Sequence, residues 1–194
     1  ASLASENLNR AMNALVTLDE DDINEVYEVE KNINFLNHAI TDYLVKVNQS
    51  TLPIEDLKYL GGLFHVVNDI ERIGDHAENI ADAARQRKEE GISFSKEAYS
   101  EVGHMLDLVN KLIQYAVEVF AKDDETHLKE IASLEDRVDD MEKELQKKHI
   151  ERLTRGECTP EAGMIFSDLV SGLERVADHA TNIAYAMVDE NGKA

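Results

Sequence analysis

Oxygen-bearing side chains recur every four residues in two separate segments of this sequence. The first segment carries Glu71, Asp75 and Asn79, and the second carries Glu174, Asp178 and Asn182. On an α-helix a step of four residues drifts by only about 40°, so each trio forms one stripe. Two carboxylates at this spacing repel each other. The pattern therefore predicts a compensating cation beside each stripe, either an arginine or a metal ion.

A further pair of oxygen-bearing residues lies on the helix that precedes each stripe. If the two helices of each set run antiparallel, four oxygen donors converge, which is the composition of a site for Mg, Ca, Mn or Fe. Zinc is less expected, because no clear His or Cys set accompanies the carboxylates. The predicted ligands are Glu30, Asn34, Glu71 and Asp75 in the first site, and Glu135, Asp139, Glu174 and Asp178 in the second.

Arginine and histidine side chains next to the stripe residues in the sequence leave other interpretations open. Arg72 and Arg175 would neutralise the glutamates in a polar network without metal, although each lies about 100° around the helix from its neighbour. His76 and His179 follow the two aspartates directly. They are candidates for phosphoacceptors or for metal ligands on another face, but a polar residue beside a partner helix is the favoured interpretation.

Helices are predicted to position these residues, because apolar side chains recur at i, i+3 and i+4 almost throughout the sequence. Six such helices can be drawn. The predicted ranges are about 2–18, 21–48, 53–89, 95–121, 124–154 and 159–188. The apolar face of the first includes Leu8, Leu15 and Val16, and that of the second includes Leu36 and Ile40. Only 9 glycines and 2 prolines are present, too few for the turns of a β-rich fold. The expected fold class is therefore all-α.

Breaks between the helices have recognisable local causes. The acidic runs at 19–22 and 123–124 read as turns that start a helix, because aspartate caps the free N–H groups of a first turn. Gly91 and Gly156 end helices, and the tail after residue 188 is expected to fray. Gly61-Gly62 lies within a helix and is interpreted as allowing close helix packing.

The two halves of the chain are copies of one three-helix unit. Eight of eleven positions are identical between Glu71–Ala81 and Glu174–Ala184, at an offset of 103. Duplication is the economical explanation, and it predicts two tandem homologous three-helix bundles, residues 1–90 and 91–194. The first helix of the first copy is shorter than its counterpart. Because the chain also begins with Ala1, we expect a fragment or domain of a longer protein.

Composition excludes several function classes. The formal net charge is −20, which repels phosphate backbones and argues against a nucleic-acid partner. The single cysteine, Cys158, allows no internal disulfide and no Cys-rich zinc site. No apolar run approaches the length of a membrane span.

Enzymatic motifs are weak in this sequence. Glu101 and His104 have the Glu-x-x-His spacing of ferritin-like di-iron bundles, but that chemistry needs a second copy, and no other helix repeats the motif at the equivalent place. There is no Gly-rich phosphate loop and no nucleophile elbow. The sequence therefore predicts a protein that is not an enzyme. A ferritin-like metal-carboxylate enzyme and a metal-free helical interaction module are the alternatives.

The repeated segments resemble a known family. E-R-I-G-D-H-A-E-N-I-A and L-E-R-V-A-D-H-A-T-N-I-A are similar to the motif repeated in the PhoU family of phosphate-transport regulators, and the resemblance covers nearly the whole chain. With its short first helix and no initial Met, the chain also resembles the soluble C-terminal PhoU-like domain of bacterial sodium-dependent phosphate cotransporters. The resemblance implies regulation of phosphate transport, with multinuclear iron or other metal clusters at the Glu/Asp motifs; zinc, manganese and magnesium are alternatives to iron.

Residue by residue, the resemblance transfers most fully to the second copy. Glu71 and Asp75 match the family motif in the first copy, whereas Asn34 replaces an expected acid beside Glu30. The second site is therefore expected to bind metal more tightly than the first. The implied partners are metal ions, phosphate held through metal, and a membrane phosphate transporter in cis or in trans, with a homo-oligomer as a further option. The implied location is cytoplasmic, including the cytosolic domain of an inner-membrane transporter.

Overall fold

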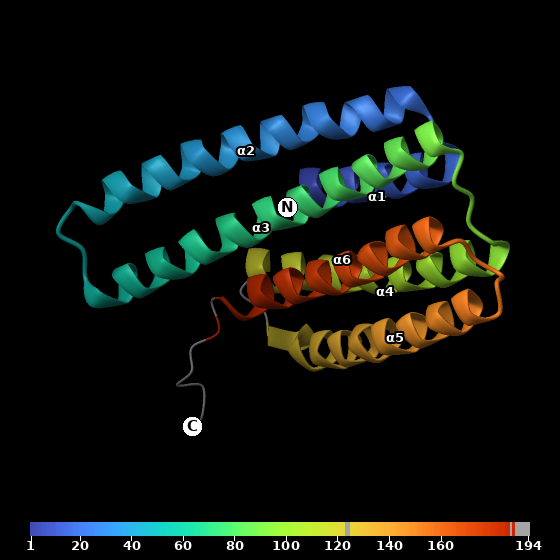
Figure 1. Ribbon diagram of the computed structural model, residues 1–194. Coiled ribbons are helices and arrows are strands. Elements are labelled where there is room, and N and C mark those ends of the chain that lie inside the picture. The colour runs from blue at the N-terminus through green and yellow to red at the C-terminus, as the bar shows by residue number, and fades with distance from the viewer. Residues whose placement is uncertain (123–124, 187, 189–194) are drawn as a thin grey trace.

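The computed structural model describes residues 1–122, 125–186 and 188, and within them it contains helices and no strand (Figure 1). The helices are α1 (Ser2–Thr17), α2 (Glu20–Asn48), α3 (Ile54–Glu90), α4 (Lys96–Lys122), the short 3₁₀ helix η1 (Glu125–His127), α5 (Leu128–Thr154) and α6 (Pro160–Tyr185). The all-α prediction is confirmed. The sixth helix ends three residues earlier than predicted, and the turn at 123–124 and the tail at 189–194 lie outside the described residues.

Local sequence explains where several helices begin and end. The Asp19 side chain accepts hydrogen bonds from the backbone N–H groups of Asp21 and Asp22 at the start of α2. Thr159 caps α6 in the same way through Ala162. Gly91 closes α3 with a φ of +67°, a left-handed conformation in which residues other than glycine are strained.

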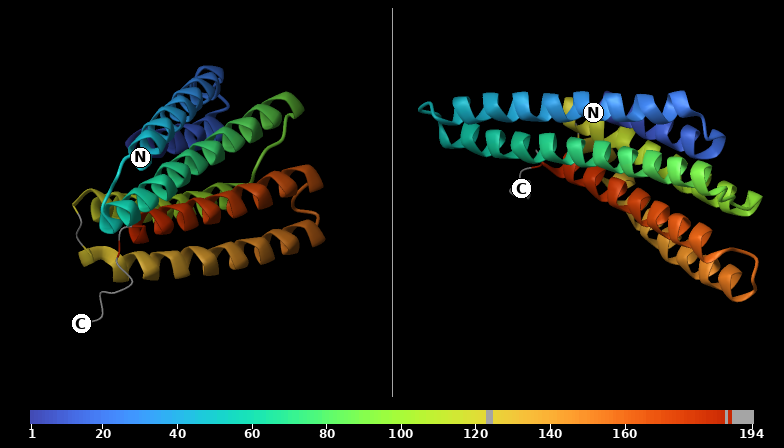
Figure 2. Two further views of the ribbon diagram at one scale, coloured as in Figure 1. Left: turned by 90° about the vertical axis from the view of Figure 1, so that its left-hand side faces the viewer. Right: turned by 45° about the horizontal axis from the view of Figure 1, so that its top comes forward.

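The six helices form two three-helix units that pack through one helix of each. α1 packs on α2 and α3, α4 packs on α5 and α6, and α3 contacts α6 between the units. Both views of Figure 2 place α3 and α6 side by side at the centre of the molecule. One continuous hydrophobic core runs through both units.

Two pairs of like residues mark where the units meet. The side chains of Asn9 in α1 and Asn110 in α4 exchange hydrogen bonds of 3.1 and 2.8 Å. The rings of His76 in α3 and His179 in α6 lie 5.8 Å apart. Because each pair joins equivalent positions of the two copies, the units face each other across an approximate two-fold axis.

Close packing at glycine occurs at positions other than the expected one. The Gly61-Gly62 interpretation is wrong for Gly61, because a Cβ there would meet nothing within 4 Å. Gly74 instead packs on Ile33, and a Cβ added to Gly74 would lie 3.2 Å from the Ile33 Cγ2. Gly163 packs against the buried ring of His149.

Three residues assigned to apolar faces are exposed. Val16 of α1 is 55% exposed, and Leu36 and Ile40 of α2 are 47% and 42% exposed. The physical reason for Leu36 and Ile40 is the length of α1. Figure 1 shows the α2–α3 hairpin extending well past the N-terminal end of α1, so this part of the hairpin is a two-helix structure.

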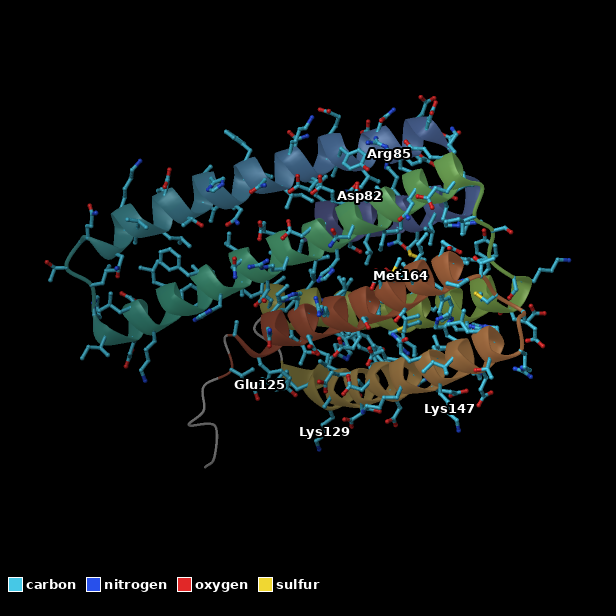
Figure 3. All side chains as sticks on the ribbon, viewed as in Figure 1. Asp82, Arg85, Glu125, Lys129, Lys147 and Met164 are labelled. Atoms are coloured by element: carbon cyan, nitrogen blue, oxygen red, sulfur yellow. The ribbon has the colours of Figure 1, made fainter. Side chains whose placement is uncertain are left out.

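Polar contacts tie α2 to the other end of α3. The Tyr27 hydroxyl donates a 2.6 Å hydrogen bond to Asp82, and the Arg85 guanidinium lies 4.6 Å from the centre of the Tyr27 ring. Figure 3 labels Asp82 and Arg85 on this stretch of α3.

Among the described residues, no helix is both long and apolar enough to cross a membrane.

The glycine contacts give a stability prediction with a matched control. In Gly163→Ala the added methyl would overlap the His149 ring, which is packed below α6, so we expect destabilisation by about 1–3 kcal/mol. Gly103→Ala, in an open position of α4, should stabilise by about 0.5–1 kcal/mol through helix propensity. Urea unfolding followed by circular dichroism measures both. Equal effects of the two substitutions would contradict this packing at Gly163.

Candidate metal centre

The carboxylates of the second copy converge between α5 and α6. Glu135 and Asp139 on α5 and Asp178 on α6 each offer an oxygen, and these oxygens lie within 4.8 Å of one another. Within the described part of the chain, this is the one group of three His, Cys, Asp or Glu side chains that meets so closely. Glu135 and Asp139 lie one turn apart on α5, so their side chains share a face. The group offers the oxygen ligands preferred by hard and borderline cations.

Mutual repulsion and burial act together on this acidic group. Burial raises the pKa of Glu135, and the charges of Asp139 and Asp178 raise it further. The pKa of Asp178 is raised by burial and then by Asp139, while His179 opposes the shift. Each raised pKa means that the ionised group is held less favourably than in water. A cation bound here would remove that penalty.

Glu174, the fourth predicted ligand, lies beside the same group without joining the close trio. Its pKa is raised by burial and by the charges of Asp178, Glu142 and Asp139, in that order. Sequence reasoning missed Glu142, which lies one turn after Asp139 on α5 and accepts a 2.8 Å hydrogen bond from Ser171. The i+3 spacing from Asp139 was its available signal.

The first copy holds its acidic residues in a different way. Glu30 of α2 is 6% exposed, and its Oε1 has no hydrogen-bond partner. Burial raises the pKa of Glu30, and the charges of Glu78, Asp75 and Glu71 raise it further, whereas a hydrogen bond accepted from the Asn34 side chain lowers it. A buried carboxylate oxygen without a partner is costly unless a cation or proton satisfies it. The four residues predicted for the first site are thus neighbours, although their oxygens do not form a trio as close as that of the second copy.

Glu78 is the residue of the first copy that sequence reasoning missed. It heads the charges that raise the pKa of Glu30, and its own pKa is raised by burial and by Asp82 and Asp75. Its counterpart in the second copy is Thr181, so a search for acids repeated in both copies passed over it. The Thr181 hydroxyl is itself buried without a partner.

The arginines that follow Glu71 and Glu174 in the sequence neutralise the carboxylates only in part. Arg72 Nη1 lies 3.7 Å from Asp75 Oδ2, and the Arg72 side chain is largely exposed. The charge of Arg72 lowers the pKa of Glu71, but burial and Asp75 outweigh it and the net shift is upward. Arg175 likewise lowers the pKa of Glu174 without reversing its upward shift. The arginine network alone therefore leaves the glutamates short of positive charge.

The asparagines of the stripes and the histidines that follow Asp75 and Asp178 lie between the two units. Asn79 and His76 line a cavity of about 410 Å³ beside α3 and α6, together with Asp82, Asp168 and Arg175. Asn182 lines a second cavity of similar volume, related to the first by the internal repeat. The drift of the stripe by about 40° per step carries the asparagines away from the carboxylates.

His76 and His179 have unequal surroundings although the sequence repeats them. His179 Nδ1 lies 2.9 Å from Asp69 Oδ1. The residue equivalent to Asp69 in the other copy is Gly172, which packs near His76 Nδ1. Burial, with the positive charges of His179, Arg175 and Arg72, lowers the pKa of His76 to about 4. Both rings lie at the boundary with a partner helix, as the favoured interpretation expected.

The carboxylate of the ferritin-like Glu-x-x-His motif is engaged in ion pairs with basic side chains of α5. Glu101 Oε2 lies 2.8 Å from Arg152 Nη1, and Lys148 lies 3.8 Å from the other oxygen of Glu101. His104 is exposed on α4. An ion pair with Arg152 leaves Glu101 a poor metal ligand.

The fold and the site together define a class of protein. Such a protein consists of two three-helix units, and carboxylates gather between the second and third helices of each unit. Residues 1–84 and 102–187 match the PhoU domain, so the chain belongs to the PhoU family. It is 32% identical over 193 residues to the phosphate-specific transport system accessory protein PhoU homolog 1 of Thermotoga maritima, covering 98% of this chain and 82% of that protein.

Solved structures share the fold. The crystal structure of PhoU from Pseudomonas aeruginosa superposes with a TM-score of 0.89 at 30% identity, covering 95% of this chain and 88% of the other. The phosphate transport system regulatory protein PhoU from Streptococcus pneumoniae superposes with a TM-score of 0.82 at 22% identity, covering 95% and 86%. The second likeness concerns the fold alone.

The lowered pKa of His76 gives a pH prediction. Between the folded value of about 4 and the unfolded value near 6.5, the unfolded chain binds the extra proton, so stability falls as pH drops through this window. In His76→Gln this part of the pH dependence should be lost. Chemical denaturation at pH 7.5 and 5.0 measures it, with exposed His104→Gln as control. An unchanged pH dependence in His76→Gln would contradict the burial of a neutral ring.

Proposed function

We propose that this chain is a regulatory domain that binds metal ions at its acidic clusters and modulates inorganic phosphate transport. Membership of the PhoU family supports the regulatory role, because its relatives carry the name of accessory proteins of phosphate-specific transport systems. The approach of the Glu135, Asp139 and Asp178 oxygens to within 4.8 Å is the observation that carries the metal-binding role.

Electrostatics supports a cation at the second site in particular. The pKa values of Glu135, Asp178 and Glu174 are raised by burial and by one another, so the metal-free cluster carries unrelieved repulsion. A divalent cation relieves repulsion and desolvation together. Metal binding to the folded state alone would also stabilise the fold.

The first site is proposed as the weaker of the two. Asn34 takes the position that Asp139 occupies in the second copy, which removes one anionic ligand. The buried, unpartnered oxygen of Glu30 supports a cation there as well. The donor sets suit iron, manganese or magnesium, and the absence of a Cys or His set from them makes zinc the less favoured ion.

Phosphate is proposed to bind through the metal. A chain with a net charge of −20 repels the anion, but a metal ion with an open coordination position reverses the local charge. Calorimetric titration of the metal-loaded protein with inorganic phosphate tests this bridge, and the absence of saturable heat rejects it.

The proposed partner is a membrane phosphate transporter, on which this chain acts in cis or in trans from the cytoplasmic side. The names of the relatives support a transport-system partner, and the cotransporter-domain assignment stays a prediction from the sequence. A regulatory rather than enzymatic role is proposed on the same family grounds. Co-purification with the transporter tests the partner, and failure to co-purify under native conditions counts against it.

Neutralising one carboxylate of the close trio separates metal binding from a purely structural role. Asp178→Asn should lose the metal of the second site and raise the stability of the metal-free protein by about 0.5–1 kcal/mol, because repulsion falls. Elemental analysis after purification without chelator, with thermal unfolding in the presence and absence of EDTA, measures both. Exposed Asp107→Asn of α4 is the matched control.

The opposite pattern identifies a metal-free module. If wild type and Asp178→Asn both purify without metal and added metal leaves their unfolding temperatures unchanged, the metal-binding proposal fails. The family assignment is untouched by that outcome.

A further inference from the structure

A small cavity lies at the end of the second unit where α4 and α6 begin. It holds about 40 Å³, and its lining includes Ala98 in the first turn of α4 and Ala162 in the first turn of α6. His149 and Arg152 line it from the last two turns of α5. Figure 1 shows the beginning of α4 beside the α5–α6 turn at this end of the molecule. Exposed Ser93 also lines the cavity, so a small ligand can enter from solvent.

Two side chains that line this cavity each have a buried polar atom without a hydrogen-bond partner. These atoms are Nη2 of Arg152 and Nδ1 of His149, and His149 as a whole is 6% exposed. Both side chains pack on Phe166, which lies 5.0 Å from the guanidinium and 5.7 Å from the imidazole ring. Buried polar atoms in proteins are almost always paired with protein, water or an ion. A single species bound in the cavity could therefore satisfy both.

The ends of α4 and α6 give the cavity a positive potential. A helix dipole favours negative charge at its N-terminus, and two N-termini meet here. Capping occupies the nearest backbone donors, because Ala98 N–H donates to Ser95 Oγ at 3.1 Å and Ala162 N–H donates to Thr159 Oγ1 at 3.2 Å. The helices therefore contribute their field, and the free donors come from the α5 side chains.

The charged side chains around the cavity also leave room for an anion. Arg152 carries a full positive charge, and its Nη1 lies 2.8 Å from Glu101 while its Nη2 stays unpaired. Burial, with the charge of Arg152, lowers the pKa of His149, so the ring is neutral at pH 7. Glu157 is the acid in the lining, and it lies 3.5 Å from Arg155. Each of the two nearby acids is thus already paired with an arginine.

The first copy shows that the helix hairpin does not require these polar side chains. At the offset that relates α2 to α5, Leu44 and Val47 stand where His149 and Arg152 occur. Leu44 is buried, as His149 is. Apolar side chains are therefore compatible with these positions of the repeat, and the unpaired polar atoms of the second copy point to a ligand.

We propose that this cavity binds a small oxyanion, such as inorganic phosphate, without a metal ion. A water molecule needs about 10–15 Å³, so the cavity has room for roughly three or four atoms of that size, which suits the oxygens of one tetrahedral anion. Arg152 Nη2 and His149 Nδ1 donate to these oxygens, each after a small rotation of its side chain. None of the eight predicted metal ligands lines the cavity, so this site does not rest on the metal centre.

Calorimetric titration of the 194-residue protein with sodium phosphate, in EDTA and at constant ionic strength, tests this site directly. Saturable binding is expected. Arg152→Lys keeps the positive charge beside Glu101 but removes the Nη2 donor, so it should weaken binding by at least ~10-fold. Arg137→Lys, which changes an exposed arginine of the same helix, should bind like wild type.

Cys158 provides a second measurement, because this single cysteine of the chain also lines the cavity. Its rate of alkylation by iodoacetamide, a neutral reagent, should fall when phosphate saturates the protein. Sodium chloride at equal ionic strength should give no protection. In Arg152→Lys the protection should be lost at the phosphate concentration that protects wild type.

Three outcomes would overturn the proposal. The first is the absence of saturable binding in EDTA; if phosphate then binds once metal is added, the metal centre alone holds the anion. The second is equal binding to Arg152→Lys and Arg137→Lys, with circular dichroism showing both variants folded. The third is an alkylation rate of Cys158 that phosphate and chloride change alike. Binding in EDTA that persists in Asp178→Asn supports this site whether or not the acidic trio binds metal.

Discussion

The packing of α2 on α3 and of α5 on α6 holds carboxylates close enough for their charges to act on one another. Glu135, Asp139 and Asp178 are brought together by helices whose adjoining apolar faces are buried, so the acids cannot separate without disturbing the core. The raised pKa values of Glu135 and Asp178 reflect the resulting penalty. The burial of apolar side chains in the core supplies the stabilising free energy that offsets this electrostatic penalty, as expected where a binding site is built on a rigid scaffold.

The two units differ in their acidic sites. Asn34 and Glu78 in the first copy stand where Asp139 and Thr181 occur in the second, so the charge of the site has moved between helices. The same comparison separates the histidines, because His179 has Asp69 beside it whereas His76 faces Gly172.

Periodicity and caps were sufficient to predict the helices, since Asp19, Gly91 and Thr159 act within a few residues of themselves. Features that depend on contacts between distant parts of the chain were harder to predict. The exposure of Leu36 and Ile40 depends on where α1 begins relative to α2, and the close packing of Gly163 depends on His149 of another helix. Glu142 and Glu78 were missed because neither repeats in both copies. The division of the chain near residue 90 and the eight ligand assignments stay predictions.

Binding of a metal ion by the close trio of the second unit is the central proposal, and the proposed binding of phosphate through the metal rests on it. Anomalous diffraction at the metal absorption edge, from crystals grown with the ion that elemental analysis identifies, tests it without intermediate steps. We predict an anomalous peak coordinated by Glu135, Asp139 and Asp178, with any peak at Glu30 weaker. A peak beside His76 and His179 instead, or no peak at the trio in fully metal-loaded protein, would contradict it.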